Sequence, residues 1–488
     1  MIFGIGLDRL VILAIVIIDL SCLLIIILVP GDRRPTAAMA WILAVILIPV
    51  LGALFFWLIG ETKLPRRWRA KQENIDQLIL ETTHGVERVS DSATWPEWFH
   101  GVVQLNRNLG SMPLIGSNSA TLIGDYRESI TAMTEAIQDA KRHVHAEFYI
   151  LSYDSTTASF FEAVREAVVR GVTVRILFDH VATLRVPGYR RTLRELRATG
   201  AQWHPMLPIQ PFRGKYQRPD FRNHRKLLVV DESVGFLGSQ NMIDSHYHRR
   251  KNLRRGLTWQ DVMARFEGPV VAGIDVVFAS DWYLTTGDSV DQNIGDALEH
   301  GGERQNLDCQ LLPSGPGYRH ENNLKLFLAL LYAARRRVVI ASPYFVPDEA
   351  LLYAISGATQ RGVHVELFVS EIGDQALVYH AQRSYYEALL RAGVDIYMYP
   401  APYILHAKHV TVDEDVAVIG SSNLDIRSFM LNMEVSMLVR GASFVRDLRA
   451  IEDGYRSKSH KVTLDEWLMR PVRSKFLDNL ARLTSALQ

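Results

Sequence analysis

The chain begins with two long apolar stretches, whereas the remainder alternates between short apolar runs and polar segments. Residues 10–30 are almost wholly apolar, with Asp19 as their only charge, and residues 37–60 form a second stretch of this kind. A bilayer core requires about 20 helical residues, which each stretch supplies. Few helices of soluble proteins are apolar on every side, so a buried hairpin of a soluble core is the weaker interpretation. The pattern predicts a transmembrane hairpin of two helices over residues 1–60, with spans of about 10–30 and 37–60.

Basic residues are concentrated directly after the second apolar stretch. Five of them lie between residues 61 and 71, whereas the loop between the stretches has only Arg33 and Arg34, offset by Asp32. An excess of Lys and Arg marks the cytoplasmic flank of a membrane span. We therefore expect a multi-pass membrane protein whose chain from residue 61 onward lies in the cytoplasm.

From about residue 112 onward, short β-like runs alternate with helical stretches, and their order repeats. The string RGVTVRILFD at 170–179 has its counterpart in RGVHVELFVS at 361–370, and neighbouring strings repeat in the same order. Strands that alternate with helices indicate an α/β fold, and the repetition indicates two lobes. The predicted domains are a hairpin at 1–60, a polar juxtamembrane connector at 61–111, a first lobe at 112–300 and a second lobe at 301–488, with the boundary near 297–306.

Composition narrows the classes of function. The chain has 488 residues, with 54 Lys and Arg against 53 Asp and Glu, which gives a net charge of +1. Proteins that bind nucleic acid depend on a clear positive excess, so we expect no nucleic-acid partner. The two cysteines, Cys22 and Cys309, exclude a disulfide scaffold and a cysteine-rich zinc site.

The repeat carries one polar pattern twice. The strings FRNHRKLLVVDESVGFLGSQN at 221–241 and LHAKHVTVDEDVAVIGSSN at 405–423 both follow H-x-K-x4-D-x6-G-S-x-N, with 182 residues between the histidines. A lone His or Lys is more often a solvated surface residue, but two identical constellations are not explained in that way. The candidate catalytic residues are the His, Lys and Asp of each motif: His224, Lys226, Asp231, His406, Lys408 and Asp413.

The spacing within each motif also predicts local geometry. Positions i and i+2 of a strand share a face, so His224 and Lys226 are expected to point the same way. Gly238 and Gly420 are expected to let the backbone approach a ligand closely. The side chains that follow these glycines supply neutral hydrogen-bond donors for the substrate phosphate or for support of the site: Ser239, Asn241, Ser421 and Asn423.

Two histidines, two lysines and several neutral donors suit phosphodiester transfer. Cations neutralise the phosphate, whose charge spreads over the non-bridging oxygens in the transition state. One neutral imidazole can attack phosphorus while the other, protonated, gives a proton to the leaving alcohol. Because ammonium groups supply the positive charge, we expect no metal and no other cofactor. The pairs His143-x-His145 and His246-x-His248 could be metal ligands, but polar positions on a loop or strand are the favoured interpretation.

Both motifs resemble the HKD motif of the phospholipase D superfamily, and longer strings are similar to bacterial cardiolipin synthases of the phospholipase D type. The similarity covers nearly the whole chain and includes AWILAVILIPVLG at 40–52, TWQDVMARFEGPVV at 258–271 and SSNLDIRSFMLNMEVS at 421–436. It implies two lobes of mixed β-sheet flanked by helices, related by a pseudo-twofold axis, that share one active site. It also implies a phosphohistidine intermediate, with His224 as nucleophile by motif position and His406 as general acid and then base. Because the two motifs are equivalent, the sequence by itself leaves these roles open.

The resemblance implies a transferase of the bacterial inner membrane. Such an enzyme moves a phosphatidyl group reversibly from one phosphatidylglycerol to another, by a ping-pong reaction, and gives cardiolipin and glycerol. The alternative is a membrane-bound phospholipase D or phosphodiesterase that hydrolyses phospholipids to phosphatidic acid, since water and lipid hydroxyls compete for one intermediate. The apolar hairpin and the net charge disfavour a nuclease, and the two intact motifs argue against a non-catalytic scaffold.

A reactive imidazole needs an acceptor, usually a carboxylate, at its second ring nitrogen. The aspartates of the motifs follow too closely on the same strand to reach their own histidines. We assign them a structural role, bonded to nearby backbone or across the lobes. Acids further along each repeat are better candidates: Asp261 lies 37 residues after His224, and Glu434 lies 28 residues after His406. We predict that each carboxylate orients the histidine of its own lobe.

Overall fold

The computed structural model of the chain describes seven single residues between 12 and 23 and the segments 35–60, 64–83, 95–209, 218–290, 307–318 and 321–483. Apart from those single residues, the predicted first span at 10–30 lies outside the described residues. The predicted boundary between the lobes at 297–306 lies outside them too.

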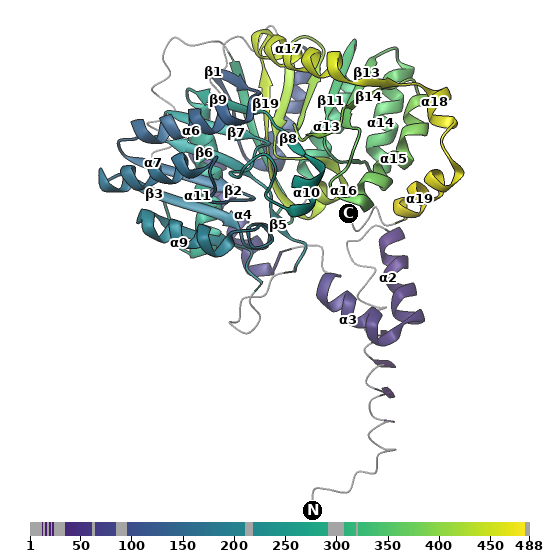
Figure 1. Ribbon diagram of the computed structural model, residues 1–488, viewed down its shortest axis with the longest axis horizontal. Helices are drawn as coiled ribbons and strands as arrows, with labels where there is room; N and C mark the ends of the chain where they lie inside the picture. The colour runs from purple at the N-terminus through teal and green to yellow at the C-terminus, as the bar shows by residue number, and fades with distance from the viewer. Residues whose placement is uncertain are drawn as a thin grey trace, which may run out of the picture.

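A single sheet of 16 strands runs through both halves of the molecule (Figure 1). The halves meet where β1 and β10 pair in antiparallel register, with Leu114 opposite Gln310. Outward from this junction, corresponding strands follow in the same order, so the sheet repeats one arrangement twice. The first half runs β1 (Leu114–Ile123), β9 (Met263–Glu267), β7 (Val234–Gly238), β6 (Lys226–Val230), β2 (His143–Phe148), β3 (Thr173–Asp179) and β4 (Gln202–Met206). The second half runs β10 (Leu307–Ser314), β19 (Asn432–Arg440), β17 (Val416–Gly420), β16 (His409–Val412), β11 (Arg337–Ala341), β13 (His364–Ser370), β14 (Asp395–Tyr399) and β20 (His460–Val462).

The helices repeat in the same way and complete an α/β fold, which confirms the predicted class. An aspartate begins one helix of each half, α6 in the first and α14 in the second, because a carboxylate at a helix start accepts from free backbone N–H groups. Asp125 accepts from the N–H of Arg127 at 2.9 Å, and Asp348 accepts from that of Leu351 at 2.9 Å. The first half contains α6 (Tyr126–Asp139), α7 (Ala158–Val169), α8 (His180–Leu184), α9 (Tyr189–Thr199), α10 (Arg250–Arg255) and α11 (Val270–Thr286). The second contains α13 (Asn322–Ala333), α14 (Glu349–Gln360), α15 (Ala376–Arg391), α16 (Ile426–Met430), α17 (Ala442–Lys458), α18 (Leu464–Leu468) and α19 (Val472–Arg482).

One buried cluster belongs to both halves. It brings together Phe278 of α11, Leu311 of β10, Met437 of β19 and Leu448 of α17, all of which are buried. Each half also has a cluster of its own on the side of its remaining helices. Because protein interiors are close-packed, the shared cluster fixes the two halves relative to each other.

Short strands cross between the halves next to the two motifs. β5 (Arg222–Asn223) pairs in parallel with β19 of the second half, and β15 (Tyr403–Leu405) pairs in parallel with β8 (Thr258–Gln260) of the first half. A further two-stranded piece joins β12 (Phe345–Val346) and β18 (Leu424–Asp425) within the second half. The first two pairings deliver each catalytic motif to the opposite half.

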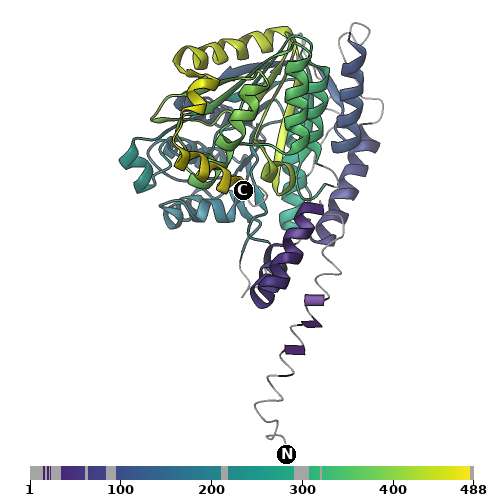
Figure 2. The same ribbon diagram turned by 90° about the vertical axis from the view of Figure 1, so that its right-hand side faces the viewer.

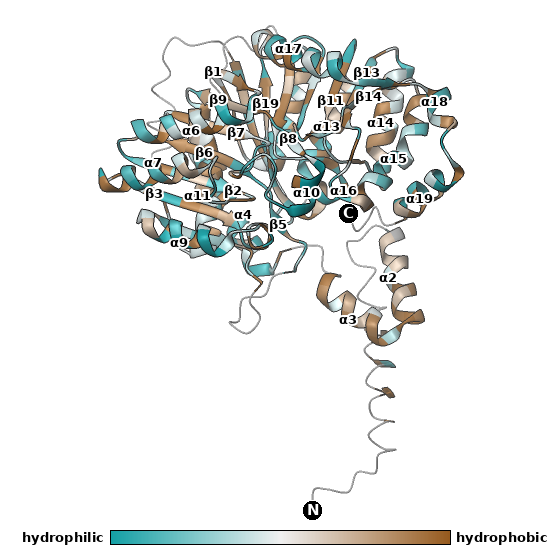
Figure 3. Ribbon diagram, in the orientation of Figure 1, coloured by the Kyte–Doolittle hydropathy of each residue, from teal (hydrophilic) through white to brown (hydrophobic). Residues whose placement is uncertain are grey.

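Two apolar helices, α2 (Pro35–Leu47) and α3 (Pro49–Ile59), extend from one end of the α/β body (Figures 1 and 2). They are packed closely at Gly52, where a Cβ atom would overlap the backbone of Ala44. Much of their outer surface is apolar (Figure 3), and Leu47 and Trp57 are each 74% exposed. No helix among the described residues has both the length and the apolar content that a membrane crossing requires.

The second predicted span, at 37–60, is therefore not one helix. It consists of α2 and α3, which are separated at Ile48 because Pro49 occupies the first turn of α3 and has no N–H to continue the helix. The predicted connector at 61–111 includes two further helices, α4 (Arg66–Thr82) and α5 (Glu97–Gly110), whose inner faces pack on the body through Ile79 and Phe99.

Candidate active site

Each motif histidine is placed by a strand pairing with the other half. The N–H of His224 donates to the carbonyl of Met433 at 2.8 Å, which continues the pairing of β5 with β19. The N–H of His406 donates to the carbonyl of Gln260 at 2.7 Å, which continues the pairing of β15 with β8. Both histidines are buried, at 7% and 5% exposure. The centre that they form therefore depends on both halves.

The predicted carboxylates do contact these histidines, but the predicted partners are wrong. Nδ1 of His224 lies 2.9 Å from Oε1 of Glu434, and Nδ1 of His406 lies 2.7 Å from Oδ1 of Asp261. Each acid thus bonds the histidine of the opposite half. The reason is the strand register: the residue after Met433 is Glu434 and the residue after Gln260 is Asp261, so each acid follows directly on the crossed pairing.

The serines of the motifs hold the carboxylates. Oγ of Ser239 donates to Asp261 at 2.6 Å, and Oγ of Ser421 donates to Glu434 at 2.6 Å. Each serine oxygen also accepts a backbone N–H of the same acid-bearing segment, from Val262 at 3.1 Å and from Val435 at 3.0 Å. These contacts favour support of the site over direct contact with phosphate.

The motif glycines allow strands to approach each other. A Cβ atom at Gly238 would overlap the carbonyl of Val262, and one at Gly420 would overlap the carbonyl of Val435. The expected close approach is therefore to the neighbouring acid-bearing strand and not to a ligand. Asn241 has a comparable supporting position, because its amide donates to the hydroxyl of Tyr247 at 2.8 Å. Asn423 is buried, and its Oδ1 atom has no hydrogen-bond partner among the described residues.

The aspartates of the motifs lie away from the histidines and bind backbone within their own halves. Asp231 accepts from three consecutive N–H groups that lead into β2, at 2.7–2.8 Å. Asp413 accepts from three that lead into β11, of which Arg336 is the nearest at 2.7 Å. Both aspartates have positive φ, at 53° and 50°, which Asp tolerates in a tight turn. They fasten each motif hairpin to the neighbouring strand.

The two lysines lie fully inside the centre. Lys226 and Lys408 are 0% and 2% exposed, and each Nζ donates to the backbone carbonyl of the histidine two residues before it. Burial lowers the pKa of Lys226 well below its ordinary value and that of Lys408 to about 8, although nearby carboxylates oppose both shifts. An ammonium has three N–H donors, so donors remain for an anionic ligand.

The two histidines experience different electrostatic surroundings. Burial, followed by the charges of Lys226 and Lys408, holds the pKa of His224 well below its ordinary value. Burial also lowers the pKa of His406, but the carboxylate of Asp261 opposes that shift. The charge of His406 itself acts on His224, as expected for groups that face one centre.

The two carboxylates differ in the opposite sense. Burial raises the pKa of Glu434 from 4.5 to about 7, against the charge of Lys226. Burial would also raise the pKa of Asp261, but the ring of His406, its hydrogen bond and Lys408 hold it below its ordinary value. Asp261 therefore favours charge on the ring of His406, whereas Glu434, with its raised pKa, favours it less on the ring of His224, although burial lowers the pKa of both histidines.

Asp179 and Arg222, beside His224, were not identified from the sequence. Asp179, at the end of β3, accepts from Arg222 at 3.0 Å and from the N–H of Asn223 at 3.0 Å, and so fixes the strand that leads into the motif. The ring of Tyr149 meets His224 edge to face at 4.7 Å between centroids. The only signal in the sequence that marks Asp179 is its position as an acid at the end of a β-like stretch.

Arg225, between the His and Lys of the first motif, points away from the centre. It is 2% exposed, its Nε donates to the carbonyl of Glu434 at 3.1 Å, and its guanidinium forms an ion pair with buried Asp281 of α11. Glu147 lies beside this pair, accepts from the amide of Asn223 at 2.6 Å, and has a pKa raised well above its ordinary value by burial and by Asp281. This network packs behind the strand that carries Glu434 and supports it.

Comparisons with known proteins identify the family. The family model described as cardiolipin synthase, PLD-like domain, matches residues 133–282 and 327–453, and the phospholipase D-nuclease N-terminal model matches residues 17–61. Cardiolipin synthase A of Proteus mirabilis is 30% identical over 470 residues, which cover 93% of this chain and 94% of the relative. The cardiolipin synthase of Geobacillus kaustophilus is 30% identical over 466 residues, which cover 93% of this chain and 90% of the relative.

The chain belongs to the cardiolipin synthase family of phospholipase D-like proteins. Among solved structures, the phosphatidylserine synthase of Haemophilus influenzae matches with a TM-score of 0.61 and 16% identity, over 81% of this chain and all of that one. This likeness supports the fold described above for both halves of the chain.

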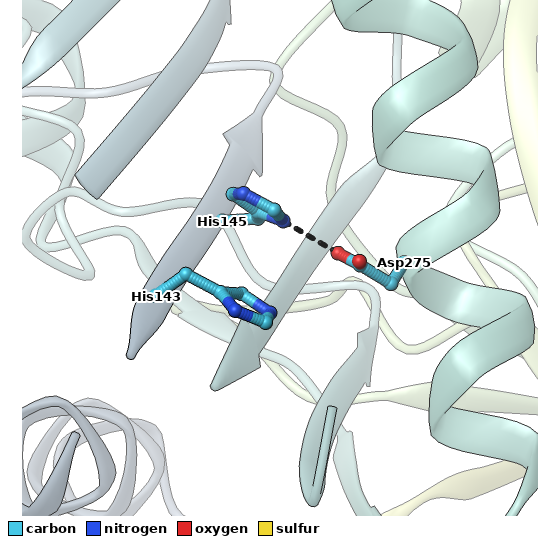
Figure 4. Close-up of side chains that lie close together, drawn as sticks. All are labelled: His143, His145 and Asp275. Atoms are coloured by element: carbon cyan, nitrogen blue, oxygen red, sulfur yellow. Dashed lines mark hydrogen bonds and ion pairs between the residues drawn. The ribbon is translucent and has the colours of Figure 1, made fainter. Parts of the chain in front are cut away.

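One cluster outside the motifs could be considered as a metal site in this cardiolipin synthase family member (Figure 4). Nδ1 of His145 bonds Asp275 at 2.6 Å, and its Nε2 lies 3.1 Å from the guanidinium of Arg175. The ring of His143 stacks on that of His145 at 4.6 Å between centroids. Stacked rings do not converge on one ion, and Arg175 places a positive charge beside it, so the cluster ties β2 to α11.

Proposed function

We propose that the chain is a phosphatidyltransferase that joins two phosphatidylglycerol molecules into cardiolipin and releases glycerol. The observation that carries the proposal is the pair of crossed bonds, His224 to Glu434 and His406 to Asp261, beside two buried lysine side chains. Relatives named cardiolipin synthases that match 93% of the chain support it. They do not favour the alternative, a hydrolase that makes phosphatidic acid.

The first half-reaction forms a phosphohistidine. Nε2 of neutral His224 attacks the phosphorus of the first phosphatidylglycerol, the P–O bond to its terminal glycerol breaks, and the leaving oxygen takes a proton from His406. Burial and the charges of Lys226 and Lys408 keep the pKa of His224 low, which supports its role as the neutral nucleophile. Glu434 accepts the hydrogen bond from Nδ1 and stabilises positive charge on the phosphorylated ring.

The second half-reaction transfers the phosphatidyl group. His406, now neutral, takes the proton of the terminal hydroxyl of a second phosphatidylglycerol, whose oxygen attacks phosphorus as the P–N bond to His224 breaks. Asp261 holds Nδ1 of His406 at 2.7 Å and stabilises its charged form, which suits an acid in the first step and a base in the second. Both steps are reversible, and the same groups serve in the reverse direction.

The lysines stabilise the phosphate during both steps. The remaining N–H groups of Lys226 and Lys408 are available for the non-bridging oxygens, whose negative charge increases in the transition state. Because burial lowers the pKa of both ammonium groups, an anionic substrate is expected to restore their protonation on binding. The residues of this chain thus provide nucleophile, acid, base and charge stabilisation.

The direct test supplies the purified full chain with phosphatidylglycerol labelled in its terminal glycerol and in its acyl chains, with and without EDTA. We expect one free glycerol for each cardiolipin and the same rate with the chelator. Phosphatidic acid as the main product would favour the hydrolase. A strict requirement for added Mg²⁺ or Zn²⁺ would overturn the mechanism.

We also propose that the apolar hairpin of residues 1–60 anchors the enzyme in the bacterial inner membrane, with both lobes in the cytoplasm. The support is the match of the N-terminal family model to residues 17–61 and the apolar outer surface of α2 and α3. Alkaline extraction is expected to leave the full chain in the membrane and to release a folded protein that begins at residue 61. A truncated protein without a folded core would contradict the division into hairpin, connector at 61–111, and lobes at 112–300 and 301–488.

A further inference from the structure

The C-terminal helix α19 exposes an apolar stripe to solvent. Met469, just before the helix, is 78% exposed. The helix residues Val472, Phe476 and Leu480 are 81%, 63% and 52% exposed, and Leu483, directly after the helix, is 81% exposed. At about 100° per residue, the last four fall within an arc of about 80°. Exposed apolar side chains scattered singly are normal, but a continuous stripe of large ones marks a contact surface.

The opposite face of α19 fixes this orientation. Asp478 is 1% exposed and lies on the other side of the helix from Phe476 and Leu480. Its carboxylate bonds Nδ1 of His380 on α15 at 2.7 Å and the guanidinium of Arg470 at 2.6 Å. Rotation of the stripe toward the body would bury apolar groups only by breaking these ion pairs, so the stripe stays outward.

The charges around the stripe identify its partner. Apart from the Arg470–Asp478 ion pair of the inner face, the charged residues of segment 469–483 are all basic: Arg473, Lys475 and Arg482, which give a charge of +3. A second copy of the same surface would bring like charges together in a symmetric contact. An apolar stripe with basic flanks instead fits the interface of a bilayer that contains anionic phospholipid.

The position of the helix agrees with that partner. In both views α19 lies at the end of the body from which α2 and α3 extend, whereas α17 lies at the opposite end (Figures 1 and 2). A bilayer that contains the proposed hairpin would therefore lie on the side of α19.

We infer that α19 is a second membrane contact, which lies in the interface of an anionic bilayer and holds the catalytic body against the surface that contains its substrate. The inference rests on the proposed hairpin, because the hairpin decides which side of the body faces the membrane.

The test places a fluorescent label at one cysteine of the full chain, in a background without Cys22 and Cys309, and reconstitutes it in vesicles. The vesicles contain phosphatidylcholine with a nitroxide on its acyl chains, with or without phosphatidylserine. The labelled variants are Phe476→Cys on the stripe, Ser457→Cys on exposed α17 as the negative control, and Leu47→Cys on α2 as the control for the hairpin.

We expect the nitroxide to quench the label at 476 nearly as strongly as the label at 47, more strongly with phosphatidylserine present, and to leave the label at 457 unquenched. Quenching at 47 without quenching at 476 would overturn the inference and leave the hairpin intact. Absence of quenching at both positions would overturn the hairpin and the inference together. If the fluorescence of the label at 476 changes with the amount of protein per vesicle but not with nitroxide, the stripe contacts a second copy of the chain.

A double variant gives an independent readout. Phe476→Glu with Leu480→Glu is expected to lower activity on phosphatidylglycerol in vesicles while leaving activity in detergent micelles and the melting temperature unchanged. Equal activity in vesicles and micelles for this variant would contradict a membrane role for the stripe.

Discussion

The two halves of the molecule present the same motif against different backgrounds. Between the motif His and Lys, the first half has Arg225, which is buried in an ion pair with Asp281, whereas the second half has the buried methyl group of Ala407. Buried Glu147 of the first half lies opposite Leu227 and likewise corresponds to buried Ala341 in the second half, which lies opposite His409. The groups that perform chemistry are thus duplicated, while the groups behind them are not.

The carboxylates show what this asymmetry achieves. Because they are exchanged between the halves, His224 faces Glu434, whose pKa is raised to about 7, and His406 faces Asp261, whose pKa is lowered. One duplicated motif can therefore place its two histidines in different electrostatic surroundings, in which charge on the ring is opposed more strongly at His224 than at His406. Each prediction below changes one half and uses the equivalent position of the other half, or a matched surface position, as its control.

The largest effect is expected from the histidines. His224→Ala and His406→Ala should each reduce the rate of transfer from phosphatidylglycerol by a factor of about 10⁴ or more, because each removes an imidazole that takes part in the reaction. A substrate with p-nitrophenol as leaving group needs no acid, so His406→Ala should keep a burst of nitrophenol that His224→Ala lacks. Stopped-flow absorbance measures the burst, and equal loss in both variants would contradict the division of roles.

The next effect concerns the ion pair behind the first motif. Arg225→Ala leaves the buried carboxylate of Asp281 without its partner, which typically costs about 3–5 kcal/mol. The melting temperature should fall markedly, whereas Ala407→Ser at the equivalent position of the second half should change it little. Differential scanning fluorimetry of the purified protein compares the two, and similar melting temperatures would show that the Arg225 network does not stabilise the site.

A smaller effect on turnover is expected from the lysines. Lys226→Ala and Lys408→Ala each remove a charged donor to the phosphate, which typically costs about 10² in rate, or about 3 kcal/mol. Lys461→Ala is the matched control, because that lysine is half-exposed and pairs with Asp395 at 2.8 Å. If either active-site variant retains activity within a factor of about two, that lysine does not contact the transition state.

The smallest effect is a difference in the pH dependence of stability. The raised pKa of Glu434 means that its neutral form contributes stability below its unfolded value of 4.5, and this contribution is lost as pH rises through about 7. The lowered pKa of Asp261 contributes stability above its unfolded value of 3.8, and this is lost as pH falls through the folded value. Wild type should therefore lose stability relative to Glu434→Gln between pH 4.5 and 7, by about 1–3 kcal/mol.

Asp261→Asn is the comparison for that experiment. It should show no such loss over the same interval, because the Asp261 carboxyl is already ionised there. Chemical denaturation in detergent at a series of pH values measures both differences. Parallel curves for the two variants would mean that the two carboxylates experience the same environment.

The duplicated fold and the site residues could be predicted from the sequence because they depend on local pattern. The alternation of strands and helices indicates the α/β class, and the six fixed positions of each motif identify His224 and His406 without any knowledge of contacts. Asp261 and Glu434 could be found as acids on β-like stretches that follow each motif. All of these signals lie within short segments of the chain.

The partners of those acids could not be predicted, because they depend on strand register between segments far apart. β5 and β19, and likewise β15 and β8, pair across more than 100 residues of sequence. Propensity and alternation do not specify such pairings. The supporting role of Ser239 and Ser421 follows from the same register, as does the position of Arg225 behind Glu434.

The most direct test of the account identifies the residue that carries the phosphatidyl group. The full chain is mixed with labelled phosphatidylglycerol, quenched with base within one turnover to preserve a phosphohistidine, digested and analysed by mass spectrometry. The variant His406→Ala is included because it lacks the base for the second step. With the substrate that has p-nitrophenol as leaving group, it should accumulate the adduct. The account predicts the label on the peptide that contains His224, and a label on the peptide with His406, or no histidine adduct in either protein, would contradict it.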